Sequence, residues 1–179
     1  MQAVLLLGGN LGKRELLLAQ AREAIEQDCG PVLRASRLYE TPAWGFTRPV
    51  PDFLNQALMI DTSLSPEALL RVCLNIELRL GRQRTEQQTG LQVAQWIAQR
   101  EVQLAEAPAE EPREYASRPI DIDILLYEDY ICQNPDLTIP HPRLPQRRFA
   151  LMPLAEIAPD WRHPQLGLTA GEMLAVCSD

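Results

Sequence analysis

The sequence lacks any apolar run that approaches the roughly 20 residues needed to cross a membrane as a helix. Its first residues, MQAVLLLGGN, contain only a short apolar stretch with no basic segment before it, which argues against a secretory signal peptide. We therefore expect a protein that makes no use of a membrane. With 179 residues, of which 46% are hydrophobic, the chain is long enough for one domain with its own core.

Cysteine and positive charge are also in short supply. The four cysteines are scattered and form no C-x-x-C pair or other metal-binding pattern, so free thiols in a reducing cytoplasm are expected. Lys and Arg total 17 against 24 Asp and Glu, which gives a net charge of −7. Because the phosphate backbone of nucleic acid attracts basic surfaces, this balance argues against nucleic acid as a partner. A small anionic substrate remains compatible if cations gather locally.

Hydrophobic patterning predicts an α+β fold. Strands are expected at 2–8, 32–40, 53–64 and 119–127, and helices at 13–28 and 66–80. The order β-α-β-β-α-β is typical of the ferredoxin-like split βαβ fold, which has an antiparallel sheet with both helices on one face. We expect the other face to be left free for loops and a ligand. Extra C-terminal elements follow: a short helix near 145–157 and a last helix that begins with a capping box, Thr169 and Glu172.

A long insertion at about 85–117 interrupts this pattern within a single domain that spans 1–179. Its first two-thirds are compatible with a helix, and APAEEPRE has the composition of an acidic linker. An excursion of this length between a core helix and a core strand is unusual unless it is functional or mobile. A lid over bound nucleotide, a docking site for a partner and a tolerated insertion without a role are the open alternatives.

The stretch SRPIDIDILLY places Asp121 and Asp123 on an otherwise apolar strand. Side chains two apart in a strand share a face, so the two carboxylates should lie side by side. A solvated strand face is the simplest alternative, but the next positions on that face, Leu125 and Tyr127, are apolar. Paired carboxylates suit Mg²⁺, which completes its octahedron with substrate phosphates and water. We expect two such ions, which would neutralise both the carboxylates and a polyphosphate.

Three arginines flank the insertion. Arg82 and Arg84 follow the second predicted helix, and Arg118 lies just before the aspartates. A solvated basic helix end accounts for the first two on their own. Taken together, the three guanidinium groups are suited to bidentate contacts with phosphate.

Two further polar residues are candidates for a site. His141 lies between prolines in IPHPRLPQRRF, near Arg147 and Arg148. A surface or packing role is the simple explanation for a lone histidine, but the prolines favour a fixed imidazole direction. Asn55 lies inside an apolar strand, where a buried amide needs partners that a bound heterocycle can supply.

Seven segments follow one another across nearly the whole chain in the order of a known family: LLLGGNLG, SRLYETPAWG, PDFLNQAL, IELRLGRQR, SRPIDIDILLY, IPHPRL and RRFALMPLAEIAPD. They resemble the 6-hydroxymethyl-7,8-dihydropterin pyrophosphokinases of folate biosynthesis. The combination of R-x-[IL]-D-[IL]-D-[IL] with a following I-P-H-P is specific. The resemblance implies transfer of pyrophosphate from ATP to the hydroxymethyl group of the pterin, with release of AMP.

The resemblance also implies roles for individual residues. Asp121 and Asp123 would hold two Mg²⁺ ions and, with Arg82 and Arg118, form the catalytic group, while ATP serves as co-substrate. Contacts with ATP are implied for Glu77, Arg82, Arg84, Arg118, Ile124, Leu137, Thr138, His141 and Arg147. Contacts with the pterin are implied for Thr41, Pro42, Trp44, Phe53, Asn55, Asp121 and Phe149. No strong general base is evident, and an aspartate or the metal are both candidates for assisting loss of the hydroxyl proton.

The chain departs from the family pattern at three positions: Gly9 replaces a serine, Asp136 an arginine of some members and Pro142 a tyrosine of some members. Trp96 is a candidate counterpart of a tryptophan that packs near the site in some members. A non-catalytic nucleotide- or RNA-binding module on the same fold is the alternative function. We expect a monomer that binds small-molecule substrates, with a dimer or a folate-pathway partner as alternatives.

Overall fold

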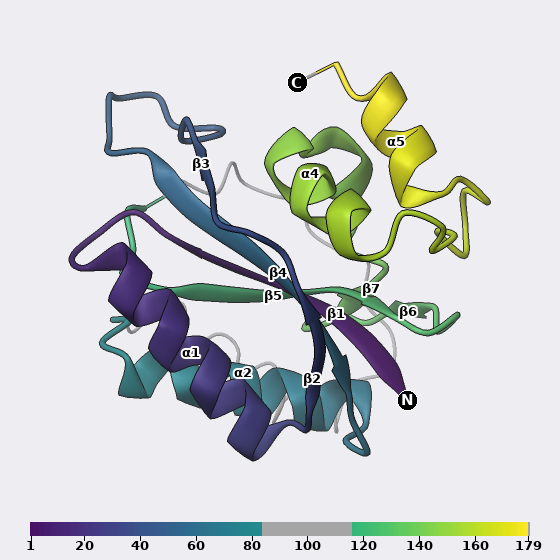
Figure 1. Ribbon diagram of the computed structural model, residues 1–179, viewed down its shortest axis with the longest axis horizontal. Coiled ribbons are helices and arrows are strands. Elements are labelled where there is room, and N and C mark those ends of the chain that lie inside the picture. The colour runs from purple at the N-terminus through teal and green to yellow at the C-terminus, as the bar shows by residue number, and fades with distance from the viewer. Residues whose placement is uncertain (84–115, 179) are drawn as a thin grey trace, which may run out of the picture.

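The computed structural model describes residues 1–83 and 116–178 as an antiparallel sheet with helices on both faces (Figure 1). Nearly all of the predicted insertion, with Arg84 and Trp96, lies outside the described residues. Within the described ranges, no helix is both long and apolar enough to cross a membrane.

The described main sheet contains β1 (Gln2–Gly9), β2 (Val32–Ala35), β3 (Tyr39–Thr41), β4 (Phe53–Asp61) and β5 (Asp121–Tyr127). The strand order is β2-β4-β1-β5. The short strand β3 lies on the same side of β4 as β2 and pairs with the first residues of β4, Phe53 to Asn55. A separate two-stranded sheet pairs β6 (Cys132–Gln133) with β7 (Thr138–Ile139). The described helices are α1 (Arg14–Asp28), α2 (Pro66–Arg79), the 3-10 turn η1 (Leu144–Gln146), α4 (Arg148–Ile157) and α5 (Ala170–Val176).

The central strand β1 is buried on both faces, which explains why its sequence is a continuous apolar run instead of an alternating one. Leu5 and Leu7 pack in the core formed with α1 and α2, whereas Val4 and Leu6 pack in a second core formed with α4 and α5. Figure 1 shows these two helix pairs on opposite sides of the sheet. The expectation that the second face is free is therefore wrong where α4 and α5 cover it, because the C-terminal segment supplies its own apolar helices.

Capping residues set the helix boundaries where the sequence predicted them. The Ser65 hydroxyl accepts a hydrogen bond from the Ala68 backbone N–H, and Pro66 occupies the first turn of α2. Thr169 and Glu172 form both bonds of the capping box that begins α5. These two predictions are confirmed.

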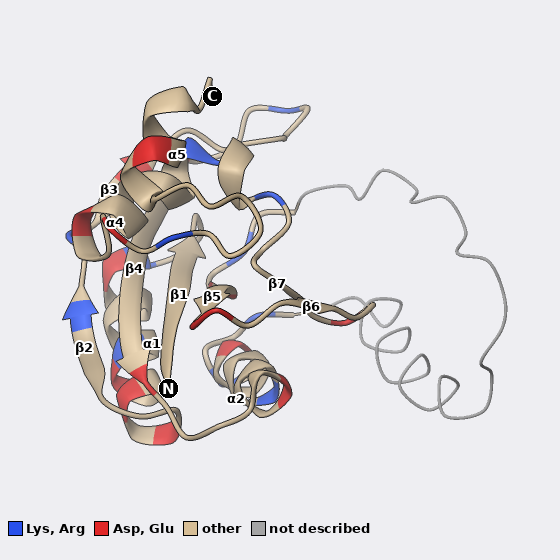
Figure 2. Ribbon diagram, turned by 90° about the vertical axis from the view of Figure 1, so that its right-hand side faces the viewer, with Lys and Arg blue, Asp and Glu red and all other residues tan. Residues whose placement is uncertain are grey.

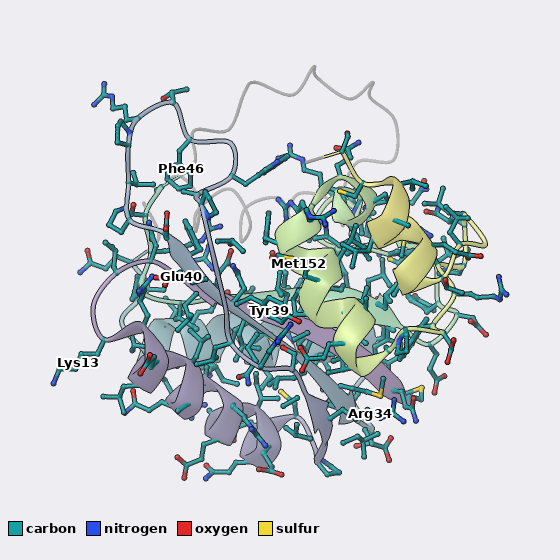
Figure 3. The ribbon with its side chains drawn as sticks, turned by 45° about the horizontal axis from the view of Figure 1, so that its top comes forward. Lys13, Arg34, Tyr39, Glu40, Phe46 and Met152 are labelled. Carbon is teal, nitrogen blue, oxygen red and sulfur yellow. The ribbon has the colours of Figure 1, made fainter. Side chains whose placement is uncertain are left out.

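The predicted strand at 32–40 is wrong as a single element. The chain divides it into β2 and β3, and Ser36 lies between them. The Ser36 hydroxyl accepts from the backbone N–H of Ala57 at 3.0 Å, and its carbonyl accepts from the Gln56 side chain at 2.7 Å. Because these side-chain bonds replace part of the regular ladder, the strand is interrupted although its apolar alternation continues. The chain then follows β3 past Tyr39 and Glu40 into the 42–52 loop, which carries Phe46 (Figure 3).

Candidate active site

A pocket opens on the part of the sheet that α4 and α5 leave uncovered. Its lining residues come from β1, β3, β4, β5, the 42–52 loop, the segment before β5 and the start of α4: Leu6, Gly8, Thr41, Pro42, Trp44, Phe46, Phe53, Asn55, Arg118, Asp121, Asp123, Arg147 and Phe149. This set includes every residue for which a pterin contact was predicted. Sequence reasoning did not assign Leu6, Gly8 or Phe46 to the site.

Two of these additional lining residues had detectable signals. A side chain at Gly8 would place its Cβ 2.8 Å from the Asn55 Oδ1 atom, so glycine leaves the space that Asn55 needs. Phe46 packs on Phe53 with ring centroids 5.8 Å apart. The sequence features that could have indicated them are the glycine pair at the end of an apolar strand and the second aromatic residue of the 42–52 loop.

The two aspartates lie on the same face of β5, as their spacing predicted, but in different electrostatic environments. Burial opposes ionisation of Asp121, but the charges of Arg118 and Arg82 outweigh it and lower the pKa of this carboxyl. Arg118 contacts Asp121 at 2.9 Å, and Arg82 pairs with the other oxygen. For Asp123, burial and the neighbouring charge of Asp121 raise the pKa to about 6, and its cation, Arg147, is 3.6 Å away.

The strand β5 has a bulge two residues after Asp123. Leu5 pairs with Ile124 and Val4 with Leu126, which leaves Leu125 as the extra residue in β5. Leu125 packs in the core with α4 and α5, whereas Tyr127 packs in the core with α1 and α2. The prediction that Tyr127 shares the face of the aspartates is therefore wrong, because the bulge changes the alternation.

Glu77 connects the end of α2 to the strand between the aspartates. It is only 1% exposed, and its carboxylate accepts from the Ile122 backbone N–H at 2.8 Å. The same carboxylate pairs with Arg82 at 2.7 Å. Arg82 therefore bridges the buried carboxylate of Glu77 and that of Asp121. Its positive charge partly neutralises Asp121 from a position outside the pocket lining.

Arg147 lies at the opposite side of the pocket, where it faces two neighbouring aromatic rings whose centroids are 6.3 Å apart. Its guanidinium carbon is 5.3 Å from the ring centroid of Trp44 and 5.6 Å from that of Phe149. His141 Nε2 is 3.3 Å from this guanidinium, and burial together with the Arg147 charge lowers the pKa of His141 to about 4. The imidazole is thus neutral at pH 7. It can form a hydrogen bond with a phosphate group without adding a positive charge.

The remaining predicted nucleotide contacts lie outside the pocket lining. Ile124 and Leu137 are buried in the core with α1 and α2, on the face of β5 opposite the aspartates. Thr138 lies on β7, and the adjoining chain is held to β5 by the hydrogen bond from the His141 backbone N–H to the Leu125 carbonyl at 2.9 Å. Any nucleotide contact at Ile124 or Leu137 would therefore use the backbone. Among the departures, Gly9 has a structural reason, since a Cβ there would lie 2.3 Å from the Pro119 carbonyl oxygen.

The oxygen atoms of Asp121 and Asp123 suit a hard divalent cation, but they do not complete its coordination. Among the described residues, no cluster of three or more His, Cys, Asp or Glu side chains is arranged to hold a metal. Mg²⁺ commonly takes only one or two protein carboxylates and fills its other positions with phosphate oxygens and water. The donor set therefore fits a cation that is bound together with a polyphosphate.

The raised pKa of Asp123 predicts that this residue destabilises the metal-free protein. Between pH 4 and about 6 the folded state binds a proton at Asp123 that the unfolded chain does not, so stability falls as pH rises through this window. The shift corresponds to about 3 kcal/mol at most, and partial exposure of the side chain reduces it. We expect Asp123→Asn to raise the free energy of unfolding at pH 7.5 by about 1–2 kcal/mol, and by less at pH 4.5. Urea titrations without Mg²⁺ at both pH values measure this, and equal stability of the two proteins at pH 7.5 would contradict it.

Comparisons with known proteins show which family this chain resembles. A sequence model of the family described as 7,8-dihydro-6-hydroxymethylpterin-pyrophosphokinase (HPPK) matches residues 4–159. A 2-amino-4-hydroxy-6-hydroxymethyldihydropteridine pyrophosphokinase from Porphyromonas gingivalis is 40% identical over 160 residues, which cover 89% of this chain and 91% of the relative. The enzyme of the same name from Aquifex aeolicus is 34% identical over 158 residues, or 88% and 81% of the two chains.

A solved structure adds a likeness of fold. The wild-type HPPK-DHPS of Plasmodium falciparum superposes with a TM-score of 0.66 at 16% identity, over 97% of this chain. This chain spans 44% of that longer protein, so the match concerns one part of it.

Proposed function

The chain belongs to the 7,8-dihydro-6-hydroxymethylpterin-pyrophosphokinase family. From this premise we propose that the aspartate side of its pocket binds the phosphates of ATP and that the aromatic side binds the pterin. The chain is an enzyme of folate biosynthesis. It transfers pyrophosphate from ATP to the hydroxymethyl group of 6-hydroxymethyl-7,8-dihydropterin and produces the pterin diphosphate and AMP. The observation that best supports this pocket as the active site is the aspartate pair on β5, which lies next to aromatic rings and is surrounded by arginines.

The phosphate side of the reaction requires charge neutralisation. A triphosphate carries about four negative charges, and attack on its β-phosphorus requires that charge to be screened and the groups to be in line. We propose that Asp121 and Asp123 hold two Mg²⁺ ions, which when bound would screen the phosphates and polarise the transferred group. Arg82, Arg84 and Arg118 would contact the same phosphates, and His141 and Arg147 would bind from the opposite side. Ile124, Leu137 and Thr138 would contact adenine, and Glu77 lies on the nucleotide side.

The aromatic side of the pocket suits a flat heterocycle. Arg118 lies over the ring of Phe53 at 5.6 Å, and Arg147 lies over Phe149, so each ring face already accepts a planar group. Asn55 is 2% exposed and donates from Nδ2 to the Thr41 hydroxyl at 2.9 Å. That bond fixes the amide and leaves Oδ1 to accept from a ring N–H or amino group. Thr41, Pro42 and Trp44 would contribute the remaining edge contacts.

Replacement of Phe53 tests the aromatic side separately. We expect Phe53→Leu to raise the KM for the pterin by about tenfold or more, because stacking of a base on an aromatic ring contributes about 1–3 kcal/mol. The KM for ATP should change by less than about threefold. Steady-state kinetics with each substrate varied in turn measure the two values. A pterin KM within twofold of the wild-type value would contradict the stacking role.

The reaction itself is tested by direct product analysis. The protein is incubated with ATP, Mg²⁺ and 6-hydroxymethyl-7,8-dihydropterin, and the nucleotide products are separated by chromatography. AMP should appear in a 1:1 ratio with the pterin diphosphate, and neither ADP nor inorganic phosphate should form in step with it. A folded sample that yields no pterin-dependent AMP would overturn the assignment.

Three broader features belong to the same proposal. The order β2-β4-β1-β5, with α1 and α2 on one face, supports a ferredoxin-like split βαβ topology with added C-terminal elements. The protein is proposed to be a single pyrophosphokinase domain that acts as a monomer, with the 85–117 insertion as a lid. A cytoplasmic location follows from the expectation of free thiols and remains a prediction.

The alternative of an RNA-binding module is not favoured. The named relatives are pyrophosphokinases. A module of that kind would present a basic sheet face with exposed aromatic residues, whereas the open face here carries two aspartates. Figure 2 also shows acidic and basic positions mixed along α2, without a basic stripe on that helix.

A further inference from the structure

Arg14, the first residue of α1, forms bonds with both ends of the loop that joins β3 to β4. Its Nη1 group donates to the backbone carbonyl of Asp52 at 2.7 Å, and its Nη2 group pairs with the Glu40 carboxylate at 2.7 Å. Glu40 directly precedes Thr41, which lines the pocket. Asp52 directly precedes Phe53, which also lines it. One planar guanidinium group therefore holds the chain on each side of this loop.

Local chemistry alone does not favour a cation at this position. The N-terminal end of a helix carries a partial positive charge, so acidic residues are favoured there and basic residues are not. The N-cap residue of α1 is Lys13, whose side chain makes no capping bond, and Arg14 adds a second positive charge in the first turn. A residue that violates a local preference calls for a reason elsewhere in the fold. The contacts with Glu40 and with the Asp52 carbonyl supply that reason.

The 42–52 loop depends on such contacts because it has little regular structure. It contains turns and bends but neither helix nor strand. The ladder between β3 and β4 spans three residue pairs and ends at Thr41 with Phe53. Figure 3 shows Phe46 of this loop, Glu40 of β3 and the start of α1 on the same side of the molecule. Because the end of a short ladder opens more easily than its centre, opening of the last pair would displace the aromatic residues of the loop.

Arg14 differs from the other described side chain that holds this loop. Asn10 donates from Nδ2 to the Pro51 carbonyl at 3.2 Å and to the Ser117 hydroxyl at 2.9 Å, so it acts on one end of the loop. Arg14 bonds at both ends and therefore closes the base of the loop. Its guanidinium does not line the pocket, so any effect on a ligand must act through the loop.

The partial exposure of this ion pair indicates what it contributes. The side chains of Arg14 and Glu40 are 30% and 56% exposed. Ion pairs of this kind add little to global stability, because solvent screens them. A loop that is already held in its binding conformation, however, loses less conformational entropy when the ligand binds. The expected contribution of Arg14 is therefore to ligand affinity and much less to the free energy of unfolding.

We propose that Arg14 is a positioning residue that closes the base of the 42–52 loop and pre-organises the aromatic side of the pocket for the pterin. This inference rests on the proposed function, which supplies the ligand. The loop is ordered to the same extent in the substrate complex and in the transition state, so Arg14 contributes uniform binding. Uniform binding lowers the KM for the pterin and leaves kcat unchanged.

The test measures pterin affinity by titration calorimetry with the full chain. The Kd of 6-hydroxymethyl-7,8-dihydropterin is determined with Mg²⁺ and an ATP analogue that has a methylene group between the α- and β-phosphorus atoms, which blocks transfer. Arg14→Ala should raise this Kd by about three- to tenfold, the scale on which the ordering of a flexible segment acts. With ATP itself, the KM for the pterin should rise by the same factor, while kcat and the KM for ATP stay within twofold of wild type.

Two further variants test whether the guanidinium acts by bridging. Arg14→Lys keeps the charge but has one compact ammonium group in place of a planar fork, so it should recover only part of the affinity. Glu40→Ala should raise the pterin Kd less than Arg14→Ala does, because the Asp52 carbonyl still accepts from Arg14. The double variant Arg14→Ala/Glu40→Ala should bind the pterin within twofold of Arg14→Ala, since the partner of Glu40 is already lost.

Arg162 provides a matched control. Its guanidinium also donates to a backbone carbonyl, that of Gly167 at 2.8 Å, but it lies in the C-terminal segment and does not line the pocket. Arg162→Ala should leave the pterin Kd within twofold of wild type. Melting temperatures are measured for every variant, and Glu40→Ala replaces Arg14→Ala in the comparison if the latter does not fold.

Each result has a defined meaning. A folded Arg14→Ala protein whose pterin Kd is less than threefold above wild type would overturn the inference and leave the proposed function intact. Full recovery in Arg14→Lys, or independent and additive effects of Arg14→Ala and Glu40→Ala, would overturn the bridging role. A loss of kcat larger than the rise in KM would also overturn it. A wild-type protein that binds no pterin and forms no AMP would overturn the proposed function itself.

Discussion

Asp121→Asn and Asp123→Asn should each lower kcat by at least about 10³-fold, the scale on which loss of a metal ligand or of preorganised charge acts. Both replacements keep the shape of the side chain and remove its charge. They should differ in stability, however. The fold favours ionised Asp121, which has a lowered pKa, and disfavours ionised Asp123, which has a raised one. Asp121→Asn should therefore destabilise the protein at pH 7.5, whereas Asp123→Asn should stabilise it.

This combination separates a catalytic role from a structural one. Rates are measured as AMP formation at saturating substrates, and stabilities by urea denaturation without Mg²⁺. Asp61 provides a matched control, because it is a carboxylate at the far end of β4 that pairs with the N-terminal amine at the surface. Asp61→Asn should leave kcat within twofold of wild type. If either active-site variant kept more than about a tenth of the wild-type rate, the metal-binding role of that aspartate would be wrong.

Arg82→Ala should reduce both activity and stability. Its guanidinium pairs with Asp121 in the pocket and with Glu77 behind it, and Glu77 is 1% exposed. Removal of one partner of a buried pair leaves an uncompensated charge, which typically costs about 3–5 kcal/mol. Loss of a cation aimed at the phosphates should lower kcat by about 10²–10³-fold. The free energy of unfolding and kcat are measured on the same preparation.

A second replacement distinguishes these two effects. The double variant Arg82→Ala/Glu77→Gln also removes the buried negative charge of residue 77. The glutamine oxygen can still accept a hydrogen bond from the Ile122 backbone N–H. Stability should recover by at least about half of the loss, because the desolvated carboxylate caused most of it. The rate should not recover, since the missing guanidinium is the one proposed to contact the phosphates of the substrate. Recovery of both together would mean that Arg82 only maintains the fold.

Several elements of the fold were accessible from local sequence because local chemistry decides them. Ser65 with Pro66 and Thr169 with Glu172 set helix starts through bonds within one turn. The aspartates of β5 share a face because strand alternation is a property of a few consecutive residues. Ser36 shows the limit: its hydroxyl bonds to Ala57, 21 residues away, and no local pattern predicts that the strand will break there.

The sequence by itself determined the family and the candidates for the chemistry: an acid pair, clustered arginines and aromatic residues in an order specific to one family. Only the tertiary structure decided how they are charged and connected. The different pKa values of Asp121 and Asp123 depend on Arg82, Arg118 and Arg147, and the link from Asn10 to Pro51 and Ser117 spans 107 positions of the chain. Electrostatic and hydrogen-bond energies depend on distance in space, and sequence separation does not reveal that distance. The covered second face of the sheet has the same origin, since α4 and α5 reach it only after the chain has folded back.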